Sequence, residues 1–118
     1  MKRSDLLKEG YIERKEDEQA FSEQTASQWL DEFPEWKIET QVGEPRLMRL
    51  YTFPDFVAAL AFTNQIGELA EEVDHHPVIE LTWGKVTLQW WTHELGGLHR
   101  NDFVMAARCD AAYAVLMV

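Results

Sequence analysis

The sequence predicts one α+β domain with the element order α-β-β-α-β-β-α, in which helices cover one face of a four-stranded antiparallel sheet. Two observations lead to this prediction. Two pairs of segments alternate apolar and polar residues on either side of a short turn, which is typical of β-hairpins. Three longer segments repeat their apolar residues at helical spacing, which is typical of amphipathic helices. A sheet covered on one side is the simplest packing that buries all of these apolar stripes.

The first 20 residues differ in composition from the rest of the chain. They are dense in charge, include the KEDE run at Lys15–Glu18, and contain few apolar residues at regular spacing. We therefore expect residues 1–20 to form a flexible tail that adds little to the core, and residues 21–118 to form the folded domain.

Three helices are expected in that domain, at 22–33, from Pro54 to about Asp74, and from about 100 to 116. Ser22 is a suitable N-terminal cap for the first helix. Pro54 is well placed in the first turn of the second helix. Asp102 lies in the first turn of the last helix, where a carboxylate interacts favourably with the helix dipole.

Strands are expected in two hairpins, at 37–42 with 46–53 and at 78–83 with 86–92. The first turn is predicted at Gly43–Pro45, and the second is a predicted two-residue turn at Gly84 and Lys85.

This second turn sets a pairing register. If Trp83 lies opposite Val86, one face of the hairpin is continuously apolar, and Trp83 and Trp90 belong to the core. The same register, extended backward along the strand, places His76 opposite His93.

Composition and charge exclude several classes of protein. The 118 residues are 46% hydrophobic and carry a net charge of -10, with no basic stripe, so we expect no direct binding to nucleic acid. The longest apolar run, Phe56–Phe62, is far too short for a transmembrane helix, and the basic N-terminus lacks the apolar segment of a signal peptide. One cysteine, Cys109, forms no internal disulfide. We expect a soluble, cytoplasmic protein with no membrane partner.

The histidines are the candidate chemical groups, because all four lie between positions 75 and 99: His75, His76, His93 and His99. Imidazoles exchange protons near neutral pH, so their convergence suits general acid–base catalysis. For any one of them, the alternative is an exposed histidine that ends a helix or strand by chance. A metal site is the weaker reading, since no H-E-x-x-H spacing is present. Cys109 falls within a helix, without the setting of a nucleophile.

Several motifs together resemble the pterin-4a-carbinolamine dehydratase family. These are Glu71–Pro77 (EEVDHHP), Thr92–Glu94 (THE), Gly97-Leu98, and Asp102. With Trp36 and the helix that follows Phe53, the resemblance covers about residues 22–118. Trp36 and Trp91 are the two tryptophans left outside the expected core, where a flat ligand could stack on them.

The resemblance implies a reaction and a set of residues. Members of this family remove water from 4a-hydroxytetrahydropterin to give quinonoid dihydropterin, which recycles the pterin of aromatic amino-acid hydroxylases without a metal or organic cofactor. It assigns catalysis to His75, His76 and His93, and substrate binding to Trp36, Glu71, Asp74, Thr92 and Asp102. It also implies a homodimer or a larger homo-oligomer.

The chain departs from the animal members at Ile79, Leu95 and His99, where tryptophan, cysteine and a Ser or Thr cap are usual. The family is also known as a dimerisation cofactor of a homeodomain transcription factor, so the alternative function is a noncatalytic binding or assembly module. Retention of all three catalytic histidines favours the enzyme.

Overall fold

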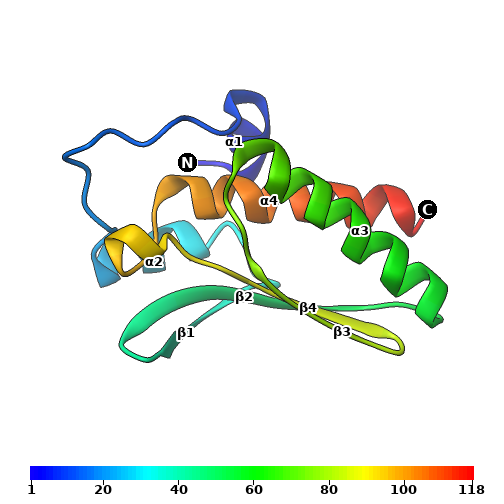
Figure 1. Ribbon diagram of the computed structural model, residues 1–118. Helices are drawn as coiled ribbons and strands as arrows, with labels where there is room; N and C mark the ends of the chain where they lie inside the picture. The colour runs from blue at the N-terminus through cyan, green and yellow to red at the C-terminus, as the bar shows by residue number, and fades with distance from the viewer.

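In the computed structural model, which describes residues 1–118, four antiparallel strands form an open sheet and all the helices lie on one of its faces (Figure 1). The strands β1 (Lys37–Gln41), β2 (Glu44–Thr52), β3 (Val78–Thr82) and β4 (Lys85–Trp90) are ordered β1-β2-β4-β3. The helices are α1 (Arg3–Glu9), α2 (Glu23–Leu30), α3 (Phe56–Val73) and α4 (Arg100–Leu116), with a short 3₁₀ turn, η1 (His93–Leu95). The predicted α+β architecture is confirmed.

The core lies between β2 and β4 on one side and α3 and α4 on the other. Val86, Leu88 and Trp90 alternate along β4 and are fully buried against the helices. Phe62 of α3 and Phe103 of α4 are buried in the same cluster. Each such side chain contributes about 1.5–3 kcal/mol through burial of apolar surface, so β4 is the central support of the layer.

Polar caps and a left-handed residue set the ends of the helices. Ser22 and Asp55 accept hydrogen bonds from the backbone amides of Thr25 and Ala58, at the starts of α2 and α3. The left-handed conformation of Asp74 (φ 52°) ends α3 and turns the chain toward the sheet. The bounds of α4 match the sequence prediction.

Both hairpins turn one or two residues earlier than the sequence predicted. Val42 and Gly43, both with positive φ, form the first turn, and Thr82 pairs with Lys85 across the second. The second turn is fixed from outside, because the Gly84 carbonyl accepts a 2.9 Å hydrogen bond from the Phe53 amide. A Cβ at Gly84 would lie 3.1 Å from the Phe53 carbonyl oxygen, so any larger residue there would require this backbone to shift by a few tenths of an ångström.

The register of β3 on β4 therefore differs by two residues from the predicted one. Ile79 pairs with Leu88 instead of Trp90. A shift of two keeps every side chain on its expected face, so the apolar face survives. Trp83, however, lies in the turn and is 68% exposed, and its predicted place in the core was wrong.

The first 20 residues pack more closely than the sequence predicted. Leu6 of α1 is only 1% exposed and belongs to the core, and α1 lies against α4. Its charged residues have partners far along the chain, such as Asp110 for Arg3. The expectation that this segment adds little to the core was wrong, because one apolar residue and distant ion pairs leave no local sequence pattern.

Candidate active site

His75 is held in a fixed position just after α3. Its amide donates a 3.1 Å hydrogen bond to the Ala70 carbonyl, which follows from the left-handed turn at Asp74. Extending the observed register places His76 opposite Trp91 and His75 opposite Thr92, just past the end of β4. The His75 side chain is 12% exposed, and its Nε2 lies 2.7 Å from Asp102 Oδ1.

Asp102 is fully buried in the first turn of α4 and accepts two further hydrogen bonds. The Thr92 hydroxyl and the His99 amide each donate to Oδ2 at 2.9 Å. These contacts stabilise the ionised carboxylate, and the positive end of the helix dipole does the same. A carboxylate accepts a proton donor, so Nε2 of His75 carries hydrogen and its Nδ1 is left with a basic lone pair in the neutral ring.

His75 and Thr92 line a polar cavity of about 220 Å³. Its other lining residues are Tyr11, Glu13, Arg14, Asp74, Glu94, His99 and Asn101. Carboxylates outnumber cations in this wall, which suits a ligand rich in N–H donors. The arrangement of a buried acid, an oriented imidazole and a polar cavity can carry proton transfer at a bound heterocycle.

His76 and His93 do not line this cavity. His76 is about half exposed, and its Nε2 lies 3.0 Å from Glu71 Oε2. The hydrogen bond with Glu71 raises the pKa of His76. His93 is 80% exposed, with Nδ1 3.4 Å from Glu44. The predicted pairing of His76 with His93 was wrong, because it depended on the displaced register.

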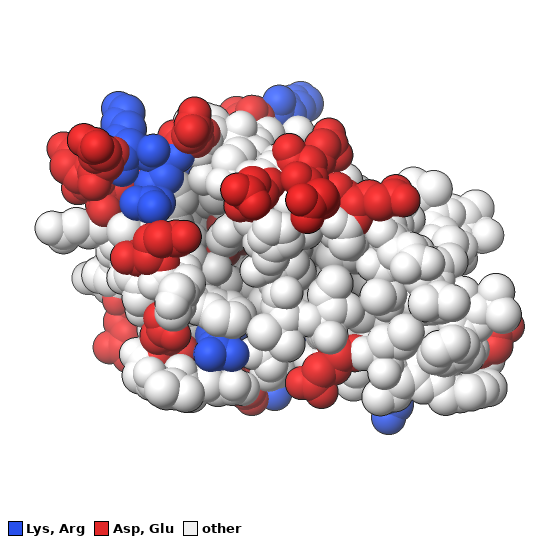
Figure 2. All heavy atoms as spheres, in the orientation of Figure 1, with Lys and Arg blue, Asp and Glu red and all other residues white.

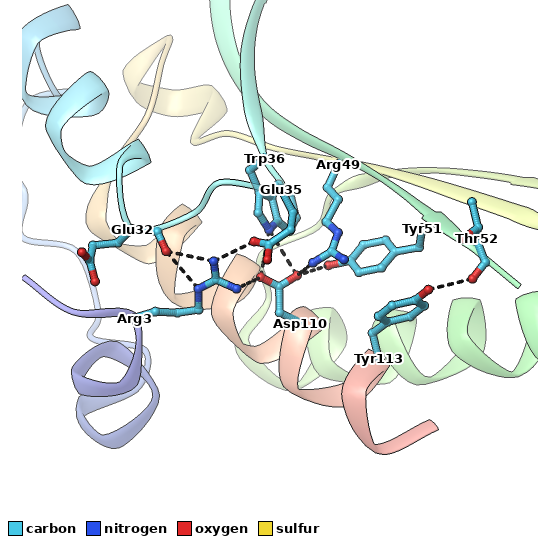
Figure 3. A network of polar contacts seen from close by, with 9 residues as sticks. All are labelled: Arg3, Glu32, Glu35, Trp36, Arg49, Tyr51, Thr52, Asp110 and Tyr113. Atoms are coloured by element: carbon cyan, nitrogen blue, oxygen red, sulfur yellow. Dashed lines mark hydrogen bonds and ion pairs between the residues drawn. The ribbon is translucent and has the colours of Figure 1, made fainter. Parts of the chain in front are cut away.

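Trp36 lies in a different part of the molecule from the cavity. It is buried, and its indole donates a 3.0 Å hydrogen bond to Asp110 (Figure 3). Trp91, the other candidate, is stacked beneath the Arg46 guanidinium, 3.9 Å from the ring centre. Of the predicted binding residues, Asp74, Thr92 and Asp102 surround His75, whereas Trp36 and Glu71 do not line the cavity.

His99 also lines the cavity, although the sequence analysis left it outside the catalytic trio. Its Nδ1 accepts a hydrogen bond from the Asn101 amide, so the imidazole caps α4 in place of a hydroxyl. Its Nε2 therefore donates to Glu18, at 2.6 Å. The departure from the usual Ser or Thr was the one signal in the sequence. For Tyr11, Glu13 and Arg14 the sequence held no signal, because no motif includes them.

Two general features of the chain bear on its chemistry. No group of three or more His, Cys, Asp or Glu side chains is placed to hold a metal ion. No helix combines the length and apolar character that crossing a membrane requires.

Comparisons with known proteins point to one family. Residues 19–112 match the family described as pterin 4 alpha carbinolamine dehydratase. A protein of Marinobacter nauticus named "putative pterin-4-alpha-carbinolamine dehydratase" is 57% identical over 84 residues, which cover 71% of this chain and 76% of the relative. A Chlorobium limicola protein of the same name is 61% identical over 77 residues, covering 65% and 68%.

Two solved structures share the fold. A protein of Brucella melitensis, described as a transcriptional coactivator/pterin dehydratase, is 27% identical with a TM-score of 0.70, covering 78% of this chain and 96% of that one. A pterin dehydratase-like protein described as a RuBisCO assembly factor in the alpha-carboxysome is 24% identical with a TM-score of 0.57, covering 66% and 88%.

Proposed function

The chain belongs to the pterin 4 alpha carbinolamine dehydratase family, and from that premise we propose that it dehydrates 4a-hydroxytetrahydropterin in the cavity beside His75. The observation that supports this activity best is the buried Asp102 that holds His75 at 2.7 Å, with the other ring nitrogen free of any partner in the chain. A noncatalytic descendant would have no need of an oriented imidazole in a polar cavity.

The reaction needs two proton transfers. The proton on ring nitrogen N5 leaves, a C4a–N5 double bond forms, and the 4a hydroxyl departs as water after it receives a proton. Nδ1 of His75 is the group that we assign to proton transfer, since Asp102 stabilises the imidazolium while the proton is held. The carboxylates of Glu13, Asp74 and Glu94 suit the amine and amide N–H donors of the pterin ring.

The resemblance includes His76 and His93 in the catalytic trio, in which we assign proton transfer to His93 and mainly substrate binding to His76. We keep both as proposals. The neighbours of His93, Thr92 and Glu94, both line the cavity, so a rotation of the His93 side chain is the movement that would bring it to bound substrate. Without bound substrate, the His93 side chain is exposed and has no evident role.

The experiment that tests the activity follows the absorbance of carbinolamine made by a pterin-dependent hydroxylase. We expect the protein to accelerate its decay well above the spontaneous rate. Since the resemblance implies a metal-free reaction, a chelator should leave the rate unchanged. Glu80→Gln, at an exposed strand residue, is the matched surface control and should behave like the parent. Decay at the buffer rate would instead favour the binding or assembly module, since one structural neighbour is described as an assembly factor.

We further propose a homodimer or larger homo-oligomer, located in the cytoplasm. Strands β1 and β3 leave two sheet edges unpaired, and the first half of α3 exposes Phe56, Val57 and Leu60 on a surface with few charges (Figure 2). Sedimentation that shows only a 13.8 kDa species at micromolar concentration would contradict the oligomer.

A further inference from the structure

We propose that the segment Tyr11–Arg14 forms one wall of the substrate cavity and that Tyr11 and Arg14 contact the bound pterin. This inference rests on the proposed function. These residues precede residue 19, where the match to the family begins, so the comparisons assign them no role. In the structure, however, Tyr11, Glu13 and Arg14 line the same cavity as His75.

The segment is attached to the start of α4 by three consecutive residues. His99 Nε2 lies 2.6 Å from Glu18, four residues after the segment. Arg100 donates to the Gly10 carbonyl at 3.0 Å and to Glu9 at 2.9 Å, just before the segment. The chain between these contacts passes over the first turn of α4 (Figure 1).

Asn101 makes the central attachment. Its side-chain amide donates to the Ile12 carbonyl at 2.7 Å, and its side-chain carbonyl accepts from the Ile12 amide at 3.2 Å. Asn101 is only 3% exposed, so losing these partners would leave buried polar groups unpaired. The segment is therefore held at Ile12, between the two residues that we assign to substrate contact.

The next residue, Asp102, orients His75. The first turn of α4 thus fixes His75 through Asp102 and the segment Tyr11–Arg14 through Asn101. A displacement of α4 would move both together, so the distance between them is built into the fold rather than left to a loose chain.

Tyr11 is placed for contact with a flat ligand. Its ring centre lies 6.2 Å from that of His75, with the planes inclined by 47°. Burial, and then the nearby charge of Asp102, raise the pKa of the Tyr11 phenol, so the hydroxyl remains a hydrogen-bond donor at neutral pH.

Arg14 is the one Lys or Arg in the cavity wall, which otherwise carries Glu13, Asp74 and Glu94. Carboxylates accept from the N–H groups of the pterin ring, whereas a guanidinium donates to its carbonyl oxygen or to the hydroxyls of its side chain. Tyr11 and Arg14 therefore add a hydroxyl and a guanidinium donor to a wall rich in carboxylates.

The test compares Tyr11→Ala and Arg14→Gln with Lys15→Gln, an adjacent cation that does not line the cavity. For each full-length protein, kcat and KM are measured with carbinolamine, and the Kd of the stable analogue 7,8-dihydropterin is measured by calorimetry. We expect Tyr11→Ala and Arg14→Gln to raise both KM and Kd by about 3- to 10-fold, with kcat near that of the parent. Lys15→Gln should change neither constant.

Parental KM and Kd in both wall variants would overturn the inference while leaving the proposed function intact. If the parent binds 7,8-dihydropterin but does not dehydrate carbinolamine, the proposed activity fails and the Kd values alone decide the inference. A parent that neither binds nor dehydrates pterins overturns both.

Discussion

Helix α4 carries two carboxylates whose partners are of different kinds, the fully buried Asp102 and Asp110, whose side chain is 9% exposed. Asp102 is held by an imidazole, a hydroxyl and a backbone amide beside a cavity. Asp110 accepts from Arg3, Arg49, Trp36 and Tyr51 (Figure 3). Both carboxylates have their hydrogen bonds satisfied, but only Asp102 has as a partner an imidazole, a group able to exchange a proton.

This difference separates a reactive site from a structural one. Guanidinium groups stay charged at every physiological pH, so Asp110 is neutralised permanently and ties α1 and β2 to α4. An imidazole gains and loses its proton, so Asp102 can support a group that takes part in proton transfer. A buried carboxylate therefore indicates function only when its partner and its access to a cavity are known.

The largest expected effect is on the reactive side of this comparison. His75→Ala should slow dehydration by about 10²–10³-fold, the scale for loss of a general acid or base. His93→Ala should produce a similar loss if its side chain turns toward bound substrate. Single-turnover absorbance measurements, corrected for the spontaneous reaction, check both variants. A parental rate in His75→Ala would refute the assigned mechanism, whereas a parental rate in His93→Ala alone would remove only His93 from it.

Asp102→Asn should lower kcat by about 10²-fold, because an amide no longer fixes the tautomer of His75 or stabilises its protonated form. Thr92→Val, which removes one hydrogen bond to the same carboxylate, should cause a smaller loss. The pH dependence of kcat is the readout that separates orientation from folding. A simple loss of folded protein would lower the amplitude of the profile without changing its shape.

At the structural carboxylate, Asp110→Asn should lower the free energy of unfolding by about 3 kcal/mol, since it leaves the partly buried Arg49 without a counter-ion and Arg3 with Glu35 alone. Urea denaturation measures this loss. The kcat of the folded fraction should stay near the parental value. An equal loss of kcat in Asp110→Asn and Asp102→Asn would mean that the two carboxylates do not differ in role.

The sequence was sufficient for the fold, but not for the geometry around His75. Amphipathic spacing, with Pro54 and Asp102 expected in the first turns, identified α3 and α4, because these signals lie within a few residues of each other. The turn of the second hairpin was misplaced because Gly84 belongs both to Trp83-Gly84 and to Gly84-Lys85, and either dipeptide could form a two-residue turn. The contact of Gly84 with Phe53 selects the first of these, and this contact is not visible in the sequence.

The remaining errors have the same physical origin. The N-terminal segment owes its position to Asn101 and Asp110, which lie far along the chain. Trp36 matches the family at a position that this fold buries against Asp110, away from the cavity. Partners distant in sequence leave no periodic pattern, so only the structure reveals them.

The smallest expected effect is at the exposed pair of His76 and Glu71, an imidazole–carboxylate contact at the surface. The hydrogen bond to Glu71 raises the pKa of His76 above 6.5, its ordinary value, and the charge of Asp74 acts in the same direction. The stabilisation from this pair is fully present below the pKa of the unfolded chain and is lost as pH rises through the higher folded value. Both side chains are well exposed, so solvent screens the pair and its effect on stability should be slight.

An NMR titration of the imidazole protons should show the elevated pKa of His76, and Glu71→Gln should bring it back toward 6.5. The pKa of His76 should then differ between the two proteins, while their unfolding midpoints coincide at a pH above the folded pKa that the titration gives, because the contribution of the pair is lost there. An unchanged His76 pKa in Glu71→Gln would show that the surface contact does not persist in solution, in contrast with the buried contact of Asp102.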